Sequence, residues 1–152
     1  MEKSWFAEYQ KTGIPETVEL PSENTSLNDV FERNFQKFGS RDAFIFMDKV
    51  LTFSELDVAS RKFAAYLQSL GLPKGSRVAV MMPNVLQYPV VALAVFRAGF
   101  VLVNVNPLYT ARELEHQLND SGADVLVIIE NFASVYQAIL GKTPVKHVVI
   151  AS

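Results

Sequence analysis

Cysteine is absent from the 152 residues of this chain. Its absence excludes a disulfide framework, a thiol nucleophile and any zinc site built on cysteine, and it suits a reducing compartment. An excess of one charge is also lacking, because 14 basic and 16 acidic residues are scattered along the sequence and give a net charge of −2. No basic patch of the kind that nucleic-acid binding requires is present, so we expect no nucleic-acid partner.

Long apolar runs are missing as well. The most apolar stretch, residues 90–105, is interrupted by Arg97, Gly99 and Asn104, so it is too short and too broken to span a bilayer. The first eleven residues carry charges and no apolar core, unlike a secretory signal. We therefore expect a cytoplasmic location, with peripheral contact at the inner face of the membrane left open.

Common catalytic and phosphate-binding motifs are absent. Gly141-Lys142-Thr143 imitates the end of a P-loop, but Tyr136 stands where the first glycine should be, and Pro144 follows instead of a helix. We interpret this segment as a helix stop with a solvated lysine. No Gly-x-Gly-x-x-Gly and no Gly-x-Ser-x-Gly occurs, so neither a dinucleotide site of the usual kind nor a serine hydrolase is indicated.

The two histidines do not indicate a metal site. His116 lies in a predicted helix, partly toward solvent, and only Asp120 stands at the i+4 position of a second ligand. His147 lies in a predicted strand and has no nearby partner in the sequence. We interpret His116 as a surface residue, and we assign no catalytic, cofactor-binding or metal-binding residue in this chain.

Helix starts and stops are marked regularly. The 49% hydrophobic and 20% charged composition indicates a globular domain. Four candidate N-cap residues stand three positions before an acidic or amide side chain: Ser26/Asp29, Thr52/Glu55, Asn84/Gln87 and Thr110/Glu113. Of these pairs, Thr52/Glu55 and Thr110/Glu113 predict full capping boxes. A glycine able to adopt the left-handed conformation closes each segment: Gly39, Gly71, Gly99, Gly122 and Gly141. Helices are predicted over 27–38, 53–70, 85–98, 111–121 and 132–140.

Short runs of strand-forming residues alternate with the later helices. Strands are predicted over 77–82, 101–105, 125–129 and 146–150, and they are apolar throughout, as strands covered on both faces are. Alternation of strand and helix predicts a parallel sheet with right-handed crossovers. Runs at 43–47 and 50–52 flank Asp48-Lys49, which we predict to be a hairpin turn. The expected fold class is α/β, with a parallel sheet, helices on both faces and a small β-hairpin.

Two segments leave alternatives open. The predicted helix 85–98 is apolar nearly all round and should be buried, but Pro89 requires either a start near Tyr88 or an irregular first turn. Residues 1–25 are predicted to be an extended lead-in to a domain over 26–152. The cluster of Trp5, Phe6 and Tyr9 in this lead-in has three candidate contacts, namely the domain, a second subunit and a membrane surface, and the sequence does not choose between them.

Asn104 and Asn106 are the candidate ligand residues. They lie at the C-terminal end of a predicted parallel strand, where α/β folds place their ligands. Asn106-Pro107 is sufficiently explained as the turn that leads to the Thr110 cap, and we favour that interpretation because Asn and Pro are common turn residues.

Three blocks resemble a known family, in order and with sensible gaps. They are Leu51-Thr52-Phe53-Ser54-Glu55-Leu56, the stretch Gly75-Ser76-Arg77-Val78-Ala79-Val80-Met81-Met82-Pro83-Asn84, and residues 96–107. Together they resemble the AMP-forming acyl-CoA synthetases, the adenylate-forming enzymes. The continuation over 106–123 is similar to bacterial long-chain fatty acid–CoA ligases.

The resemblance implies a reaction in two steps. An acyl-adenylate forms from a fatty acid and Mg·ATP with release of pyrophosphate, and the acyl group then passes to the thiol of coenzyme A. The family's phosphate-binding and catalytic motifs lie beyond Ser152, so ATP, Mg²⁺ and CoA are implied for a full-length protein and no cofactor for this piece. The matched motifs are mainly scaffold in the family.

We therefore expect the truncated N-terminal part of the family's large domain, inactive by itself and prone to self-association through an exposed sheet edge and apolar patches. The alternatives are an aryl- or medium-chain acyl-CoA ligase and a free-standing α/β binding module.

Overall fold

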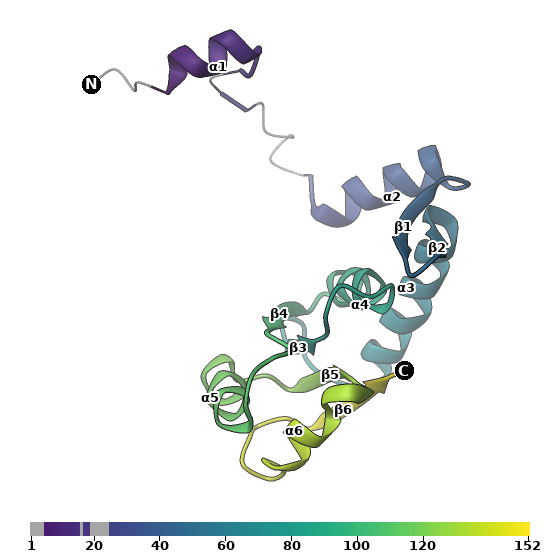
Figure 1. Ribbon diagram of the computed structural model, residues 1–152. Helices are drawn as coiled ribbons and strands as arrows, with labels where there is room; N and C mark the ends of the chain where they lie inside the picture. Colours follow the sequence, from purple (N-terminus) through teal and green to yellow (C-terminus); the bar gives the residue numbers. More distant parts are fainter. Residues whose placement is uncertain (1–4, 16, 19–24) are drawn as a thin grey trace.

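A four-stranded parallel sheet organises the computed structural model, which describes residues 5–15, 17–18 and 25–152 (Figure 1). The strand order is β4-β3-β5-β6, and all three pairings are parallel. The strands are β3 (Arg77–Met81), β4 (Val101–Val105), β5 (Val125–Ile129) and β6 (His147–Ala151). The predicted strands are thus confirmed to within one residue, and the sheet is parallel as expected.

Helices cover both faces of the sheet. α3 (Phe53–Ser69) and α4 (Gln87–Arg97) lie on one side, and α5 (Ala111–Ser121) and α6 (Ala133–Gln137) lie on the other (Figure 1). Val78 and Val80 of β3 pack toward the first pair, whereas Ala79 and Met81 pack toward the second. This alternation follows from the two-residue period of a strand, and it explains why the central strands are apolar throughout.

A third apolar cluster joins α2 (Leu27–Phe38) to the rest. Phe35 of α2, Leu56 of α3 and Leu93 of α4 are buried together, and Leu51 of the hairpin packs against them. Gly39 follows α2, and a Cβ added there would lie 2.8 Å from the Ser54 Oγ. Gly39 has a right-handed φ of −41°, so the prediction of a left-handed helix end is wrong here. A side chain at this position would force Ser54 or the α2 backbone to shift, so close approach favours glycine here.

The capping boxes define three helix starts. Those at Thr52 and Thr110 are confirmed, and Ser26 forms a third full box because its side chain accepts from the Asp29 amide while the Asp29 carboxylate accepts from the Ser26 amide. Aspartate is thus long enough to close the box here. The predicted Asn84 cap is wrong, since α4 starts at Gln87 after Leu86 without a side-chain cap.

Pro89 is the third residue of α4. The amides of a helix's first turn have no intrahelical acceptor, so a proline at this point removes no helix hydrogen bond. The late start therefore resolves the difficulty that the sequence presented. No residue of α4 is exposed, as expected for a helix that is apolar nearly all round.

The hairpin turn lies one residue earlier than predicted. Strands β1 (Asp42–Phe46) and β2 (Lys49–Thr52) pair antiparallel, with Phe46 opposite Lys49. The turn residues are thus Met47 and Asp48, with φ values of 46° and 60°. Two positive φ values match the right-handed twist of a hairpin, and Asp tolerates that region.

Two further expectations need correction. The lead-in is not extended throughout, because helix α1 (Phe6–Thr12) forms within it and ends at Gly13. The predicted helix 132–140 is shorter, since a 3-10 turn, η1 (Glu130–Phe132), precedes α6 and turns follow it. The parts of the predicted lead-in at 1–4, 16 and 19–24 lie outside the described residues.

Candidate functional site at the end of the sheet

Asn104 and Asn106 lie where β4 ends. Asn106 Oδ1 accepts a hydrogen bond from the Leu108 amide at 3.0 Å, and the Asn106 carbonyl accepts from the Tyr109 amide at 3.1 Å. The Asn106 side chain therefore closes an Asx turn on its own backbone, and this contact supports its interpretation as a turn residue.

Asn104 ties three elements together. Its Oδ1 accepts from the Tyr88 hydroxyl of α4 at 2.8 Å, and its backbone carbonyl accepts from Gln117 Nε2 of α5 at 2.9 Å. A helix from each face of the sheet thus reaches the same residue of the edge strand. Sequence reasoning missed both contacts, because Tyr88 and Gln117 are 16 and 13 residues away in the chain.

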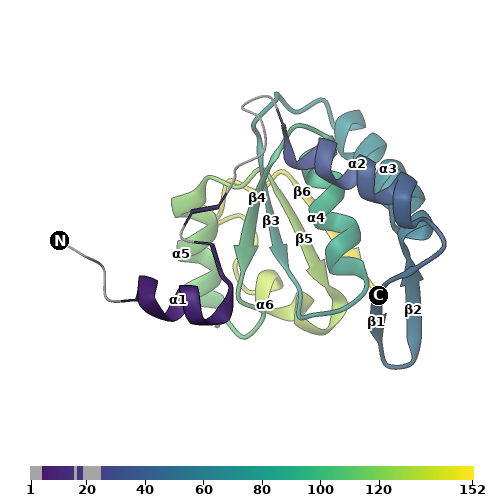
Figure 2. The ribbon, with the colours of Figure 1, turned by 90° about the horizontal axis from the view of Figure 1, so that it is seen from above.

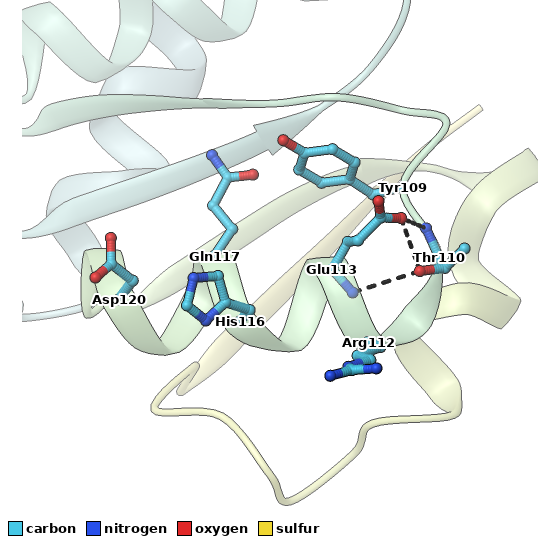
Figure 3. A pocket seen from close by; sticks show the side chains of 7 residues that line it. All are labelled: Tyr109, Thr110, Arg112, Glu113, His116, Gln117 and Asp120. Atoms are coloured by element: carbon cyan, nitrogen blue, oxygen red, sulfur yellow. Dashed lines mark hydrogen bonds between the residues drawn. The ribbon is translucent and has the colours of Figure 1, made fainter.

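A shallow hollow of about 760 Å³ lies along α5 (Figure 3). Gln117 points toward the neighbouring strand, while Arg112 points to the opposite side of the helix (Figure 3). The Gln117 Oε1 is buried and has no hydrogen-bond partner among the described residues. The hollow is lined by Tyr109, Thr110, Arg112, Glu113, His116, Gln117 and Asp120.

Glu113 is the titratable group with a resolved pKa shift in this hollow. Its Oε2 accepts from the Thr110 amide at 2.8 Å and from the Thr110 hydroxyl at 2.7 Å. The hydrogen bond from the Thr110 backbone is the main cause that holds the pKa of Glu113 below its ordinary value. A carboxylate that is held ionised and whose oxygen already accepts hydrogen bonds from the N-cap residue is poorly placed to act as a general acid or base.

The structure separates the two histidines. His116 is exposed on α5, as predicted, and His147 is half-buried at the start of β6. Within the described part of the chain, no three residues of the types His, Cys, Asp and Glu are grouped so that they could hold a metal ion. The described helices include none that is long and apolar enough to cross a membrane.

The segment Gly141-Lys142-Thr143, which resembles the end of a P-loop in sequence, forms a turn after α6. Gly141 has a φ of 77°, Lys142 is exposed, and the Lys142 carbonyl accepts from Asn119 Nδ2 at 3.1 Å. No helix follows within the next residues, which run into β6. The prediction of a solvated lysine is therefore confirmed, but the prediction of a helix stop at Gly141 is wrong, because α6 already ends at Gln137 with Ala138 as its C-cap.

An ion-pair cluster on the other side of the sheet was also missed. The Arg97 side chain is 9% exposed, and its Nη2 donates to Glu32 Oε1 at 2.8 Å and to Asp57 Oδ1 at 2.5 Å. Arg61 bridges the same two carboxylates. A charge inside an apolar run was the available signal, but its partners lie 40 and 65 residues away. The cluster joins α2, α3 and α4.

The contacts around Asn104 and Arg97 hold helices against one another and against the sheet. The polar groups around Asn104 and Arg97 mostly bond to one another or to backbone, and the carboxylates that accept from hydroxyls elsewhere belong to the capping boxes at helix starts. What these groups do chemically is fix the helices against the sheet.

Comparison with known proteins identifies the relatives of this chain. Residues 31–152 match the family described as AMP-binding enzyme. A long-chain-fatty-acid–CoA ligase of Escherichia coli is 50% identical over 151 residues, which are 99% of this chain and 27% of that protein. The ligase of the same name from Yersinia pestis is also 50% identical, with 99% of this chain and 26% of that protein covered.

The fold comparison agrees. The crystal structure of a long-chain-fatty-acid–CoA ligase from Archaeoglobus fulgidus superposes with a TM-score of 0.81 and 31% identity, covering 88% of this chain and 28% of that chain. The chain thus spans about a quarter of the length of the curated relatives it matches, and the matched quarter is their N-terminal part. The expected resemblance and fold class are both confirmed.

Proposed function

Since the chain belongs to the family of AMP-binding enzymes, we propose that it serves as the N-terminal scaffold of a long-chain-fatty-acid–CoA ligase. The observation that carries the proposal is the 50% identity to ligases of that name over nearly the whole chain.

The reaction follows from this assignment. A fatty-acid carboxylate oxygen attacks the α-phosphorus of ATP and pyrophosphate leaves, which gives the acyl-adenylate. The thiol sulfur of CoA then attacks the acyl carbon, AMP leaves, and the thiol proton passes to a base. ATP, Mg²⁺ and CoA are the groups that supply this chemistry when bound.

The residues described here do not fit those groups. They include no carboxylate cluster for Mg²⁺, and the glycine and lysine of Gly141-Lys142-Thr143 form a turn, with no phosphate loop. We therefore route no step through this chain and propose that its own contribution is to position the sheet. On this proposal the 152 residues alone are inactive.

ATP–pyrophosphate exchange tests the proposal. The 152-residue chain and a protein extended to the length of the Escherichia coli relative would be assayed with Mg²⁺ and either oleate, octanoate or benzoate. We expect exchange only from the longer protein and fastest with oleate. Preference for octanoate or benzoate would favour the medium-chain or aryl alternative, whereas exchange by the short chain would reveal a complete site. If neither protein exchanges with any acid, the binding-module alternative gains support.

We propose a cytoplasmic location with peripheral membrane contact through α1. Trp5 and Phe6 lie with ring centroids 6.3 Å apart, and Phe6 and Tyr9 with centroids 6.1 Å apart, so three aromatic rings gather at the start of one short helix, whose N-cap is Trp5. Trp and Tyr favour the membrane–water interface. Co-sedimentation with phospholipid vesicles should weaken in a Trp5→Ala/Phe6→Ala variant and persist in a Lys11→Ala control. Equal sedimentation of the double variant would contradict the proposal.

We also propose that the 152-residue chain self-associates. β4 and β6 are the edge strands of the sheet, and the side chains of Val101, Val148 and Ile150 on them are exposed. Open strand edges and apolar surface promote contact between copies. Light scattering over a concentration series should show a mass that rises above that of the monomer, and a constant monomer mass would refute it.

A further inference from the structure

Helix α2 is held at its C-terminal end by contacts that do not depend on charge. The Gly39 carbonyl, just past the helix, accepts a hydrogen bond from the Ser54 amide of α3 at 2.9 Å. The Phe38 and Phe53 rings lie with their centroids 5.9 Å apart. Figures 1 and 2 show α4 between α2 and the parallel sheet. This end of α2 is therefore fastened to the start of α3.

The first half of α2 is held instead by polar and charged groups. Asn28 Nδ2 donates to the Phe96 carbonyl of α4 at 3.2 Å. The Glu32 carboxylate pairs with Arg97 of α4 at 2.8 Å and also with Arg61 of α3. The Glu32 and Arg61 side chains are 36% and 55% exposed, so salt ions reach these pairs. The attachment of this half therefore depends on ionic strength.

Apolar packing beneath the first half of α2 is incomplete. Phe35, the one residue of α2 that is buried within the described chain, lies in the second half, and Phe31 is only partly buried. A hollow of about 360 Å³ adjoins the first half, and its walls include the small side chains of Ala64 and Ala65. Asn28 Oδ1 is buried and has no hydrogen-bond partner among the residues described. A hollow in place of apolar contact and a buried acceptor without a donor both weaken the docked arrangement.

The core on the sheet does not need α2. Among the described residues, none of those in the two buried clusters on the faces of the sheet belongs to this helix, and Phe35 contributes to the third cluster instead. Regions with few buried apolar contacts open locally at a lower free energy than the core does. The first half of α2 can therefore open while the sheet stays folded.

We propose that residues 27–34 form a latch that ionic strength controls. They undock from α4 while the second half of α2 stays fastened at Phe35 and Gly39, and the ion pairs of Glu32 hold them closed. Screening weakens these pairs, since the Debye length falls from about 10 Å at 0.1 M salt to about 3 Å at 1 M. Opening uncovers the Arg97 guanidinium and carries the start of the helix away from α4. This device goes beyond the proposed scaffold function and does not rest on it.

Hydrogen–deuterium exchange tests the latch in the protein extended to the length of the Escherichia coli relative. The undocked half-helix is too short to stay helical alone in water, so its amides exchange when the latch opens. Between 0.1 M and 1 M KCl, exchange in residues 30–34 should accelerate about threefold or more, because screening removes the attraction between partly exposed charges. Exchange in β3 and β5 should not change, which shows in the same experiment that the sheet is intact.

Glu32→Gln removes the charge that faces Arg97 and Arg61 and keeps the length of the side chain. In 0.1 M KCl this variant should exchange residues 30–34 about fivefold faster than the parent protein. Raising KCl to 1 M should then add less than about twofold. Arg33→Gln is the matched control, since it removes a charge from the next residue, which is exposed and donates to the Asp29 carbonyl outside the Glu32 pairs. The control should exchange like the parent protein at both salt concentrations.

Three results would overturn the inference. Exchange in residues 30–34 that is as slow as in β3 at both salt concentrations would show that this half of α2 does not open separately. Salt acceleration that persists in full in Glu32→Gln would show that other groups hold the helix. Equal acceleration in α2, β3 and β5 would show that the whole domain opens together.

Discussion

Arg97 and Asp57 are joined by two hydrogen bonds. Arg97 Nη2 donates to Asp57 Oδ1 at 2.5 Å, and Nη1 donates to the Asp57 backbone carbonyl at 3.0 Å. The Arg97 guanidinium also lies 5.1 Å from the centre of the Phe35 ring. One arginine on α4 thus holds both α3 and α2, and the sequence shows it only as a charge that interrupts an apolar run.

Replacing Arg97 should therefore destabilise the fold. Arg97→Met leaves the Glu32 and Asp57 carboxylates without their most buried partner. We expect a loss of about 2–3 kcal/mol in the free energy of unfolding, less than for a fully buried pair because both carboxylates are partly exposed. Urea titration measures the loss. Arg61→Met is the control, and it should cost under about 1 kcal/mol because Arg61 is largely exposed. Equal losses would contradict a special role for Arg97.

The capping boxes should each contribute to stability. Thr110→Ala and Thr52→Ala remove the side-chain acceptor for the amide of the third helical residue. Each should lower the free energy of unfolding by about 1 kcal/mol. Thr→Ser at the same positions keeps the acceptor and should cost much less. If Ser and Ala variants unfold at the same urea concentration, the caps do not act as the geometry indicates.

Acid should weaken the fold through the same boxes. Hydrogen bonds from the Thr52 and Thr110 backbones hold the pKa values of Glu55 and Glu113 below their ordinary value of 4.5. A carboxyl with a lowered folded-state pKa stabilises the protein above its unfolded pKa, and that stabilisation is lost as the pH falls through the folded-state pKa. The urea concentration at the unfolding midpoint should fall as the pH is lowered below about 5. In the double variant Glu55→Gln/Glu113→Gln, this fall should be smaller. An unchanged drop in the double variant would assign acid sensitivity to other groups.

Gly39 should not tolerate a larger side chain. Gly39→Ala places a Cβ 2.8 Å from Ser54 Oγ and 3.2 Å from the Phe35 carbonyl oxygen. We expect a cost of about 1–2 kcal/mol in unfolding free energy. Gly39→Ala/Ser54→Ala removes one of the two close contacts and should recover part of the loss. A stabilising Gly39→Ala would show that the neighbours move aside freely.

Asn106 should behave as a turn residue. In the longer ligase, Asn106→Asp keeps an oxygen for the Leu108 amide and should change ATP–pyrophosphate exchange by less than about twofold. Asn106→Ala should lower stability by about 0.5–1 kcal/mol, the net value of one hydrogen bond. A hundredfold loss of exchange in Asn106→Asp with unchanged unfolding would show instead that Asn106 contacts a substrate.

Local chemistry explains what could be predicted from the sequence. A capping box is satisfied within four residues, so Thr52 and Thr110 mark the starts of α3 and α5 in any fold. The apolar runs of β3 and β5 likewise predict strands covered on both faces, and alternation with helices predicts a parallel sheet. Two of the failures were also local: at Asn84, where apolar α4 starts without a side-chain cap, and at the hairpin turn, where backbone twist selected Met47 and Asp48 over Asp48 and Lys49.

The sequence by itself determined the fold class of this protein, its family and its helices and strands, except for α1 and the extent of α6. Only the tertiary structure decided the strand order, the Arg97 cluster, the link from Tyr88 through Asn104 to Gln117, and the hollow beside α2. The physical reason is the distance along the chain. Propensity and capping act over a few residues, whereas Arg97 meets Glu32 across 65 residues, and such contacts exist only after the helices have packed on the sheet.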